Sequence, residues 1–584
     1  MVKADLVLLH PPSVYDFRQK AILYGPISDL VPSTSAFEMY PIGFTTLAEY
    51  LERHGCRVRI VNLAVRMLRD ENFDAQELIA SLNPLAFGID LHWLPHAQGA
   101  LEVARMVKRC HPHTPVIMGG FSSSYYHQEL LGYPEVDYVV RGDSTEEPLR
   151  LLMACLAAGE EPWQVPNLTW RDRGGQVRVN PLTYLPEDLD NLMLDYSQVV
   201  KFAARDRDLA SYIPFKNWLE YPIMAGLTCR GCIHGCVTCG GSAYAFRRLF
   251  GRTRPAYRSP EALARDIRNI QRLSRGPVFV LGDIRQPGMD YAHRFLRAIR
   301  GLREQVIIEF FAPASRKFLQ EVAAALPNFC LEVSLESHDP AVRRAFGKSY
   351  SNEDMERTME YALEAGCQRL DVFFMVGLPK QTYSSVMETI NYCQTLMERF
   401  GGDGKLRPFI SPLAPFLDPG SRAFEHPERY GYRLFHRTLE EHRQALLSPS
   451  WKYVLNYETE WMSRDEIVAS TYEAGLRLNR LKARYGLVDP QQARRTEARI
   501  RKAVALMERI DRLVASAEPE EVQRQLQRLK PHIDRVNTST VCEKSELELP
   551  VGPAKLNGYR IFWLVFKGWL TDMARQLRFA LGRS

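Results

Sequence analysis

Four of the chain's eleven cysteines lie in one short run, Cys229-Arg-Gly-Cys232-Ile-His-Gly-Cys236-Val-Thr-Cys239. Within this run, Cys232, Cys236 and Cys239 have the spacing Cys-x3-Cys-x2-Cys, so three thiolates on a tight loop can each reach a different iron of one cubane. If only three irons have protein ligands, the fourth stays open to a small molecule. The run therefore predicts a [4Fe–4S] cluster, and we expect Cys229 to lie outside its ligand set.

Other kinds of cysteine site fit this spacing less well. Zinc ribbons separate their two cysteine pairs by about 15–20 residues, but here only a few residues separate Cys232 from Cys236. Bacterial ferredoxin runs place a proline after the last cysteine, whereas this run continues with Gly240. A disulfide framework is typical of small domains in oxidising compartments. The remaining cysteines are scattered singly, so we expect no second cluster: Cys56, Cys110, Cys155, Cys330, Cys367, Cys393 and Cys542.

The cysteine motif resembles the signature of the radical S-adenosylmethionine (SAM) superfamily. One position departs from it, because Thr238 stands where the family usually has an aromatic residue. The resemblance implies that SAM chelates the open iron through its amino and carboxylate groups. It also implies that a reduced cluster gives SAM one electron, which releases methionine and a 5′-deoxyadenosyl radical able to take hydrogen from an unactivated C–H bond.

The length and composition indicate a large globular protein, and the alternation of strands and helices described below places it in the α/β class. A chain of 584 residues suggests roughly three or four domains. We expect no signal peptide, because the chain leads at once into a short apolar strand, and no apolar stretch approaches the ~20 residues of a membrane span. Unpaired cysteines and an oxygen-sensitive cluster predict a cytoplasmic protein.

Residues 1–150 alternate short apolar strands with helices, which predicts a buried parallel sheet of the flavodoxin or Rossmann type. The expected strands cover residues 6–9, 58–61, 85–89, 115–118 and 137–140. Ligands of such sheets bind beyond the carboxyl ends of the strands. Gly119 and Gly120 follow the fourth strand, where a large ring can approach the backbone closely.

The strand order and these endings resemble the B12-binding domain found upstream of the barrel in one class of radical SAM enzymes. The resemblance implies cobalamin as a cofactor, bound beside Gly119 and Gly120. No Asp-x-His-x-x-Gly motif follows the first strand, so we expect no histidine ligand from that motif. His92 follows the third strand, either as a polar loop residue or near the cobalt. A B12-like fold that has lost its cofactor is the alternative.

After a connector over residues 151–220, strands and helices alternate again over residues 221–445. Six strand–helix units fit the partial (β/α)6 barrel of the radical SAM superfamily, with its active site at the carboxyl ends of the strands. The resemblance assigns Gly282 and Asp283 to the SAM amino group. It likewise assigns Glu336 and Ser337 to the ribose, and the turns at Gly377 and Pro412 to the adenine. Taken singly, each is equally consistent with an ordinary turn or surface residue, and no other catalytic residue is assigned.

The C-terminal part is helical and basic. Residues 464–584 hold 23 Lys and Arg against 15 Asp and Glu, so the positive excess of the whole chain lies there. We divide this part into a helical basic region, residues 446–557, and an amphipathic terminal helix, residues 558–584. On a helical wheel Arg560, Lys567, Thr571, Arg575 and Arg578 share one face, and Phe562, Phe566, Trp569, Met573 and Leu577 cover the other. Residues 558–583 could thus lie on a membrane surface, or dock on the protein's own core; no nucleic acid is expected.

The domain order predicts cobalamin-dependent methylation, or another C–C bond-forming reaction, at an unactivated carbon. A lipid substrate is favoured, as in the B12-type radical SAM proteins that this chain resembles, which methylate hopanoids or build rings in tetraether lipids. Tetrapyrrole, peptide and natural-product substrates stay open. A non-catalytic cobalamin sensor or adaptor would leave the cysteine run unexplained. We further expect a reductase such as flavodoxin or ferredoxin as partner, and a cytoplasmic protein peripheral on the inner membrane face.

Overall fold

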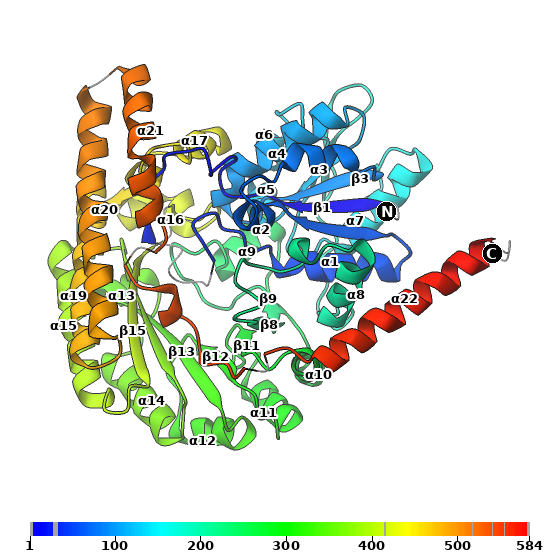
Figure 1. The fold of residues 1–584 in the computed structure, drawn as a ribbon. Helices are drawn as coiled ribbons and strands as arrows, with labels where there is room; N and C mark the ends of the chain where they lie inside the picture. Colours follow the sequence, from blue (N-terminus) through cyan, green and yellow to red (C-terminus); the bar gives the residue numbers. More distant parts are fainter. Residues whose placement is uncertain are drawn as a thin grey trace.

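A computed structural model describes residues 4–26, 33–413, 416–516, 518–539, 541–553 and 555–580, without the side chains of residues 519, 569 and 571–580. Two sheets dominate it, one in the N-terminal third and one in the middle of the chain, and a helical region follows (Figure 1). This is the α/β architecture that the sequence predicts, with a B12-binding type of domain, a partial barrel and a helical C-terminal region.

The N-terminal sheet has five parallel strands in the order β2-β1-β3-β4-β5. Its strands are β1 (Leu6–His10), β2 (Val58–Asn62), β3 (Ala86–Asp90), β4 (Val116–Gly119) and β5 (Tyr138–Val140). Apolar side chains point to both faces, because helices cover both. The helices are α1 (Ile42–Arg53), α2 (Leu63–Arg69), α3 (Ala75–Ser81), η2 (Leu94–His96), α4 (Ala97–Cys110), α5 (Phe121–Tyr125), α6 (His127–Leu130) and α7 (Glu146–Ala158).

The segment that we expected to be a connector is partly built into this sheet. Two antiparallel strands, β6 (Leu168–Arg171) and β7 (Val177–Val179), extend it beyond β5. The chain then forms α8 (Tyr196–Asp206) and the short η3 (Leu209–Ser211). Helix α8 lies between the two sheets, where it packs on α1, α10 and the terminal helix.

The second sheet is the predicted partial barrel, with six parallel strands in sequence order. Its strands are β8 (Met224–Leu227), β11 (Val278–Leu281), β12 (Val306–Phe310), β13 (Phe329–Glu336), β14 (Leu370–Val376) and β15 (Leu406–Pro412). The short pair β9 (Cys229–Arg230) and β10 (Ala256–Tyr257) flanks the cysteine loop. The helices are α9 (Ala243–Phe250), α10 (Pro260–Leu273), α11 (Met289–Ile299), α12 (Arg316–Ala325), α13 (Pro340–Phe346), α14 (Asn352–Glu364) and α15 (Tyr383–Phe400).

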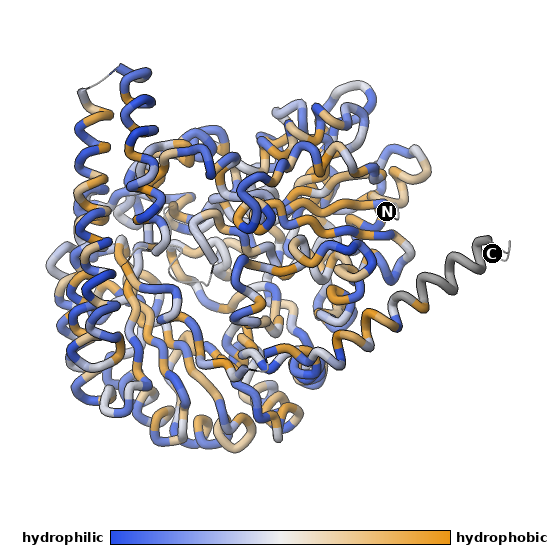
Figure 2. Tube along the Cα trace, in the orientation of Figure 1, coloured by the Kyte–Doolittle hydropathy of each residue, from blue (hydrophilic) through white to orange (hydrophobic). Residues whose placement is uncertain are grey.

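Long helices cover the β15 edge of the barrel (Figure 1). Helices α19 (Arg464–Arg484), α20 (Pro490–Ser516) and α21 (Pro519–Val536) pack in turn, and Figure 2 shows their alternation of apolar and polar residues. Smaller elements precede and follow them: α16 (Arg422–Glu425), η4 (Pro427–Tyr430), β16 (Tyr432–Leu434), α17 (Leu439–Ala445), α18 (Trp451–Val454), β17 (Tyr457–Thr459) and η5 (Lys544–Glu546).

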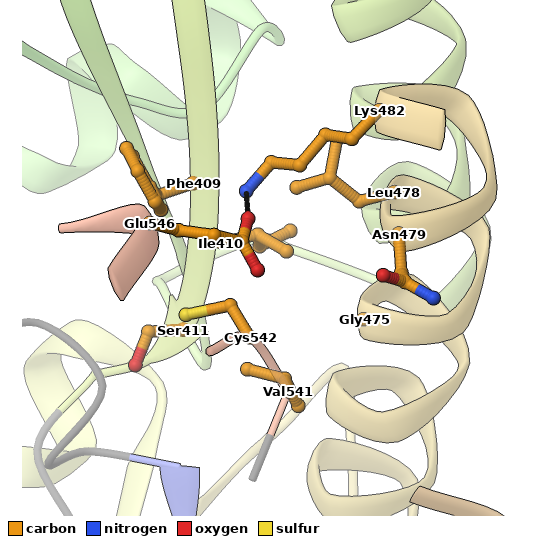
Figure 3. Close-up of a pocket in the computed structure, with 10 residues that line it drawn as sticks. All are labelled: Phe409, Ile410, Ser411, Gly475, Leu478, Asn479, Lys482, Val541, Cys542 and Glu546. Carbon is orange, nitrogen blue, oxygen red and sulfur yellow. Dashed lines mark hydrogen bonds and ion pairs between the residues drawn. The ribbon is translucent and has the colours of Figure 1, made fainter. Parts of the chain in front are cut away.

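A buried ion pair fastens the segment after α21 to the barrel. Lys482 Nζ of α19 lies 2.9 Å from Glu546 Oε2, and the aromatic ring of Phe409 lies beneath the ammonium group (Figure 3). Arg369 at the start of β14 donates to the backbone carbonyls of Glu546 and Glu548. The segment therefore crosses the amino-terminal ends of the barrel strands in a fixed path.

The last helix that the structure describes is α22 (Gly558–Ala580), which runs past α8 and α10 and then away from the body of the protein (Figure 1). Leu564 is buried, whereas a row of large side chains on the opposite face is exposed: Tyr559, Phe562, Trp563, Phe566 and Leu570. The side chains predicted at Trp569, Thr571, Met573, Arg575, Leu577 and Arg578 lie outside the described ones. No helix in the described part of the chain is both long and apolar enough to cross a bilayer.

Candidate active site

The cysteine loop leaves the barrel at the carboxyl end of its first strand. β8 ends at Leu227, and Cys232, Cys236 and Cys239 follow before α9 begins at Ala243. Backbone amides point at two of the sulfurs, His234 N at Cys232 Sγ (3.4 Å) and Gly241 N at Cys239 Sγ (3.3 Å). Such N–H···S contacts are common around iron–sulfur clusters and adjust their reduction potential.

The loop is fixed against the end of α13. Val237 N donates to Phe346 O over 2.9 Å. Gly347 follows with φ +117°, and a Cβ there would lie 3.1 Å from Gly235 O and 3.4 Å from the Cα of Cys236. The glycine thus lets the loop approach closely, so the position of Cys236 is set by tertiary packing and not by the motif alone.

Burial raises the pKa of all three motif thiols, of Cys236 to about 11. Free thiols here would therefore stay protonated, and a metal must displace the protons to bind. Among the described residues, no three His, Cys, Asp or Glu side chains are arranged to hold a single metal ion. A cubane does not require such convergence, because each thiolate binds a different iron.

A cavity of about 550 Å³ joins the cysteine loop to the N-terminal sheet. One wall carries Cys232, Cys239 and Gly282 of the barrel; the opposite wall carries Gly119 and Gly120 at the end of β4. We call it the cofactor cavity. It lies at the carboxyl ends of both sheets, where the sequence places both ligands.

Gly119 and Gly120, on the wall formed by the N-terminal sheet, differ in what surrounds them. A Cβ on Gly119 would meet only Val140 O, at 4.0 Å, so this position opens toward the cavity. Gly120 has φ +116°, and a Cβ there would lie 2.4 Å from the Cα of His92. Gly119 therefore offers a bare surface to a large ring, whereas Gly120 permits the turn that packs on the loop after β3.

His92 also lines the cofactor cavity. Its imidazole lies 4.9 Å from the ring of Phe121 and is accessible from the cavity. Cys229, the cysteine outside the motif, lines the cavity as well and donates its thiol proton to Gly231 O.

Two buried ion pairs hold the two walls of the cavity together. Arg230, next to Cys229, binds both oxygens of Glu146 at the start of α7, over 2.8 and 2.5 Å. Arg252, just after α9, binds Asp143 in the loop before α7, with Nη2 2.9 Å from Oδ1. Because both pairs are largely buried, removal of one partner would leave an uncompensated buried charge.

The residues expected at the SAM amino group differ in their accessibility. Gly282 lines the cofactor cavity. Both carboxylate oxygens of Asp283 accept hydrogen bonds from Arg285, over 2.9 and 2.6 Å, and Oδ2 also accepts from Phe311 N. Glu309, which sequence reasoning missed, accepts the N–H of Gly282, and burial raises its pKa to about 7.

Of the other SAM-contact candidates, none borders the cofactor cavity. Glu336 has a left-handed backbone (φ +66°) and is paired with Lys348 over 2.6 Å, but its Oε2 is buried with no partner among the described residues. Ser337 Oγ accepts the N–H of Asp339, and Gly377 O accepts the hydroxyl of Tyr432. Pro412 lines a separate small cavity. These assignments stay predictions, with the free oxygen of Glu336 the most ready acceptor for a hydroxyl.

The arrangement fits its expected cofactors. Three thiols lie on one anchored loop, two of them with backbone donors on sulfur. Gly119 leaves an open surface across the cavity, where a large ring can approach the backbone.

Comparisons with known proteins agree with this fit. Residues 29–152 match the B12 binding domain and residues 227–393 match the Radical SAM superfamily. The chain is 22% identical to cytidylyl-2-hydroxyethylphosphonate methyltransferase of Streptomyces wedmorensis, over 62% of this chain and 73% of the other.

Solved structures share the fold. The cobalamin-dependent SAM radical enzyme OxsB, with aqua-cobalamin and SAM bound, aligns with 99% of this chain and 80% of its own at 13% identity and a TM-score of 0.54. The radical SAM methyltransferase TsrM from Kitasatospora setae, with cobalamin and a [4Fe–4S] cluster bound, aligns with 74% of this chain and 80% of its own at 18% identity and a TM-score of 0.51.

Fold and site together define a radical SAM protein with an N-terminal B12-binding domain. The chain is an enzyme of the B12-dependent radical SAM class, and its cofactors are a [4Fe–4S] cluster, SAM and cobalamin.

Proposed function

We propose that this enzyme transfers a methyl group to an unactivated carbon of a lipid. The observation that carries the methyl transfer is the single cofactor cavity, which borders both Cys232 of the barrel and Gly119 of the B12-binding domain. When bound, the cluster and SAM supply radical chemistry and cobalamin supplies a transferable methyl group, and one cavity lets both act on one substrate atom.

In this proposal the chain's own residues position the reactants and exclude water. Cys232, Cys236 and Cys239 hold the cluster, and Gly119 gives cobalamin its surface. The ion pairs Arg230–Glu146 and Arg252–Asp143 fix the two walls of the cavity relative to each other. Closure of this kind keeps a reactive intermediate away from solvent. An external donor, such as a flavodoxin or ferredoxin, supplies the electron.

The names of two relatives support methyl transfer over other C–C bond formation. The Streptomyces wedmorensis relative is a methyltransferase, and so is TsrM. Their names give a phosphonate and, for one TsrM structure, tryptophan as substrate. The lipid in our proposal therefore rests on this chain's own terminal helix.

Helix α22 presents a row of aromatic side chains to solvent. Tyr559 is 82% exposed, Phe562 67% and Trp563 48%. Phe566 packs on both Phe562 and Trp563, so the rings form one continuous patch. We call Tyr559, Phe562, Trp563, Phe566 and Leu570 the aromatic patch. A basic helix with such a patch suits the interface of an anionic membrane.

The test pairs genetics with reconstitution. Lipids of a deletion strain are compared by mass spectrometry with those of the parent, and the missing methylated species identifies the substrate. Anaerobically reconstituted enzyme should then move a deuterated methyl group from SAM to that unmethylated lipid and release 5′-deoxyadenosine. Identical lipid profiles in the two strains would contradict the lipid assignment, and product without a deuterated methyl would contradict methyl transfer.

A further inference from the structure

A second and larger cavity lies inside the barrel, on the side of the terminal helix. Its volume is about 620 Å³. The strands contribute alternate residues, such as Phe279 and Leu281 of β11 and Cys330 and Glu332 of β13, so it borders the inner face of the sheet. We call it the lumen cavity.

The wall opposite the sheet is helical and apolar. Val199, Ala203 and Ala204 of α8 line it, as do Ile561 and Val565 of α22. Ile561 and Val565 belong to the same helix that carries the aromatic patch. One face of α22 therefore borders the lumen cavity and its other face meets solvent, which puts the cavity directly behind the patch.

The lumen cavity and the cofactor cavity are neighbours. Ile42 at the start of α1 and Leu281 at the end of β11 line both the lumen cavity and the cofactor cavity. A molecule that fills the lumen cavity would therefore contact the same two side chains that border the cofactor cavity.

The lining also limits what can bind. No lysine, arginine or histidine of the described residues lines the lumen cavity, so a phosphate or carboxylate would find no cation there. The ionisable acidic side chains that line it are Glu332 of β13 and Asp371 of β14, which lie opposite each other on adjacent strands. Asp371 is paired with Arg369 over 2.7 Å, whereas Glu332 makes no ion pair with any described residue.

Burial and the charge of Asp371 raise the pKa of Glu332 well above its usual value. A protonated carboxyl in an apolar cavity both donates and accepts hydrogen bonds. Its natural partner is an uncharged hydroxyl, because an unpaired polar group in such surroundings is unfavourable.

We propose that the lumen cavity binds an uncharged hydrocarbon chain that carries a hydroxyl group, drawn from the membrane side at α22, with Glu332 as its hydrogen-bond partner. This proposal rests on the lipid substrate proposed above and adds its binding site. The reacting carbon then lies near Ile42 and Leu281, and the rest of the chain fills the barrel.

Binding is tested on the reconstituted holoenzyme without turnover, with the uncharged fluorophore N-phenyl-1-naphthylamine as probe. Ala204→Trp fills the cavity from α8 and should weaken probe binding roughly tenfold or more. Val199→Trp, from the same wall, serves as a second variant if the first fails to fold. Ala157→Trp, at an exposed position on α7, is the matched control and should bind like the wild type. Cluster and cobalamin content should be equal in all.

Competition then tests Glu332. In the wild type 1-decanol should displace the probe more strongly than decane, and Glu332→Leu should remove that advantage while decane still competes. Equal competition by both in the wild type, or unchanged probe affinity in the folded Trp variants, would overturn the proposal. The binding assay involves no turnover, so the two proposals can fail separately. If the lumen cavity binds the probe but the enzyme methylates no lipid, only the proposed function is refuted. If the enzyme methylates a lipid but the lumen cavity does not bind the probe, only this inference is refuted.

Discussion

Gly119 and Gly120 are adjacent glycines on the wall of the cofactor cavity opposite the cysteine loop, and they have different roles. Gly119 opens to the cavity, whereas a side chain at Gly120 would collide with the backbone of His92. Replacement of Gly120 is thus a poor test of cobalamin binding, since it strains a left-handed turn by about 1–3 kcal/mol and disturbs the fold itself.

The cleaner substitution is Gly119→Leu. It should abolish cobalamin retention by steric exclusion, while the melting temperature and the iron content of the barrel stay as in the wild type. Cobalamin bound per chain is measured by absorbance after anaerobic gel filtration. Gly120→Ala should instead lower the melting temperature. Normal cobalamin content in Gly119→Leu would show that the ring lies elsewhere.

The cysteine assignment makes a second prediction. Cys232→Ala, Cys236→Ala and Cys239→Ala should each lose SAM cleavage, because each removes the ligand of a different iron. Cys229→Ala is the matched control: it lines the same cavity but bonds to Gly231 O, and it should keep the cluster and 5′-deoxyadenosine release. Iron and sulfide analysis measures the cluster content of each variant, and chromatography measures the 5′-deoxyadenosine that it releases. A cluster-free Cys229→Ala would contradict the ligand set.

A third prediction concerns pH and His442 of α17. This imidazole is buried, with its ring centroid 6.3 Å from that of Phe424, and burial lowers its pKa to about 3. Its folded pKa is below the unfolded value of about 6.5, so the unfolded state takes up a proton first as the pH falls. Acidification from about pH 7 to about pH 5 should therefore cost about 2 kcal/mol through this residue.

Urea unfolding at the two pH values measures this loss. His442→Phe should lack it, and His54→Phe, at an exposed position, should show the same loss as the wild type. An equal loss in His442→Phe and wild type would mean that His442 does not carry it.

At the scale of elements, the positions of the strands could be predicted from the sequence more easily than the contacts that they and their neighbouring residues make. The strand expected over residues 58–61 is observed as β2 (Val58–Asn62), because Val58-Arg-Ile-Val61 is a short apolar run. β6 and β7 were not expected in the N-terminal sheet, since strand pairing after a connector depends on tertiary structure. The motif spacing found the three cysteines. It could not find the partners Arg230 and Glu146, which lie 84 residues apart.

Glu309 is a site residue that could have been predicted from the sequence. It is a carboxylate in an otherwise apolar strand and points to the inner face, where Gly282 N donates to it. A charged residue in a buried strand usually has a functional or paired role, so the sequence alone could have nominated it. For α22, two options were open from the sequence, docking on the protein's core or lying on a membrane surface. One face of the helix docks on α8 and the other is exposed, and the membrane role stays a prediction.

The fourth prediction concerns the aromatic patch of α22. Each large apolar side chain that leaves water contributes roughly 1.5–3 kcal/mol, and each basic residue near an anionic surface about 1 kcal/mol. Phe562→Ser with Phe566→Ser should therefore abolish co-sedimentation with anionic vesicles, whereas high salt should only weaken it. Val514→Ser removes an exposed apolar side chain from α20 and is the control. Undiminished vesicle binding in the double variant would contradict a membrane role for the patch.

At the scale of the whole molecule, the two sheets meet at their carboxyl ends and enclose the cofactor cavity. The ion pairs Arg230–Glu146 and Arg252–Asp143 link them directly. The C-terminal region adds a second link, because Asn537 after α21 donates to Ile22 O of the N-terminal segment over 2.8 Å. The B12-binding domain is therefore held over the barrel mouth from two sides, which favours a fixed active site over a hinged one.

The central claim is that cobalamin and the cluster share this one cavity, and electron paramagnetic resonance tests it without knowledge of the substrate. In holoenzyme that contains cob(II)alamin and the reduced cluster, the two electron spins should interact, and the cob(II)alamin signal should be broadened. The broadening should vanish in Cys236→Ala, which retains cobalamin but lacks the cluster. A cob(II)alamin signal that is equally sharp in both proteins would place the two cofactors apart and contradict the account.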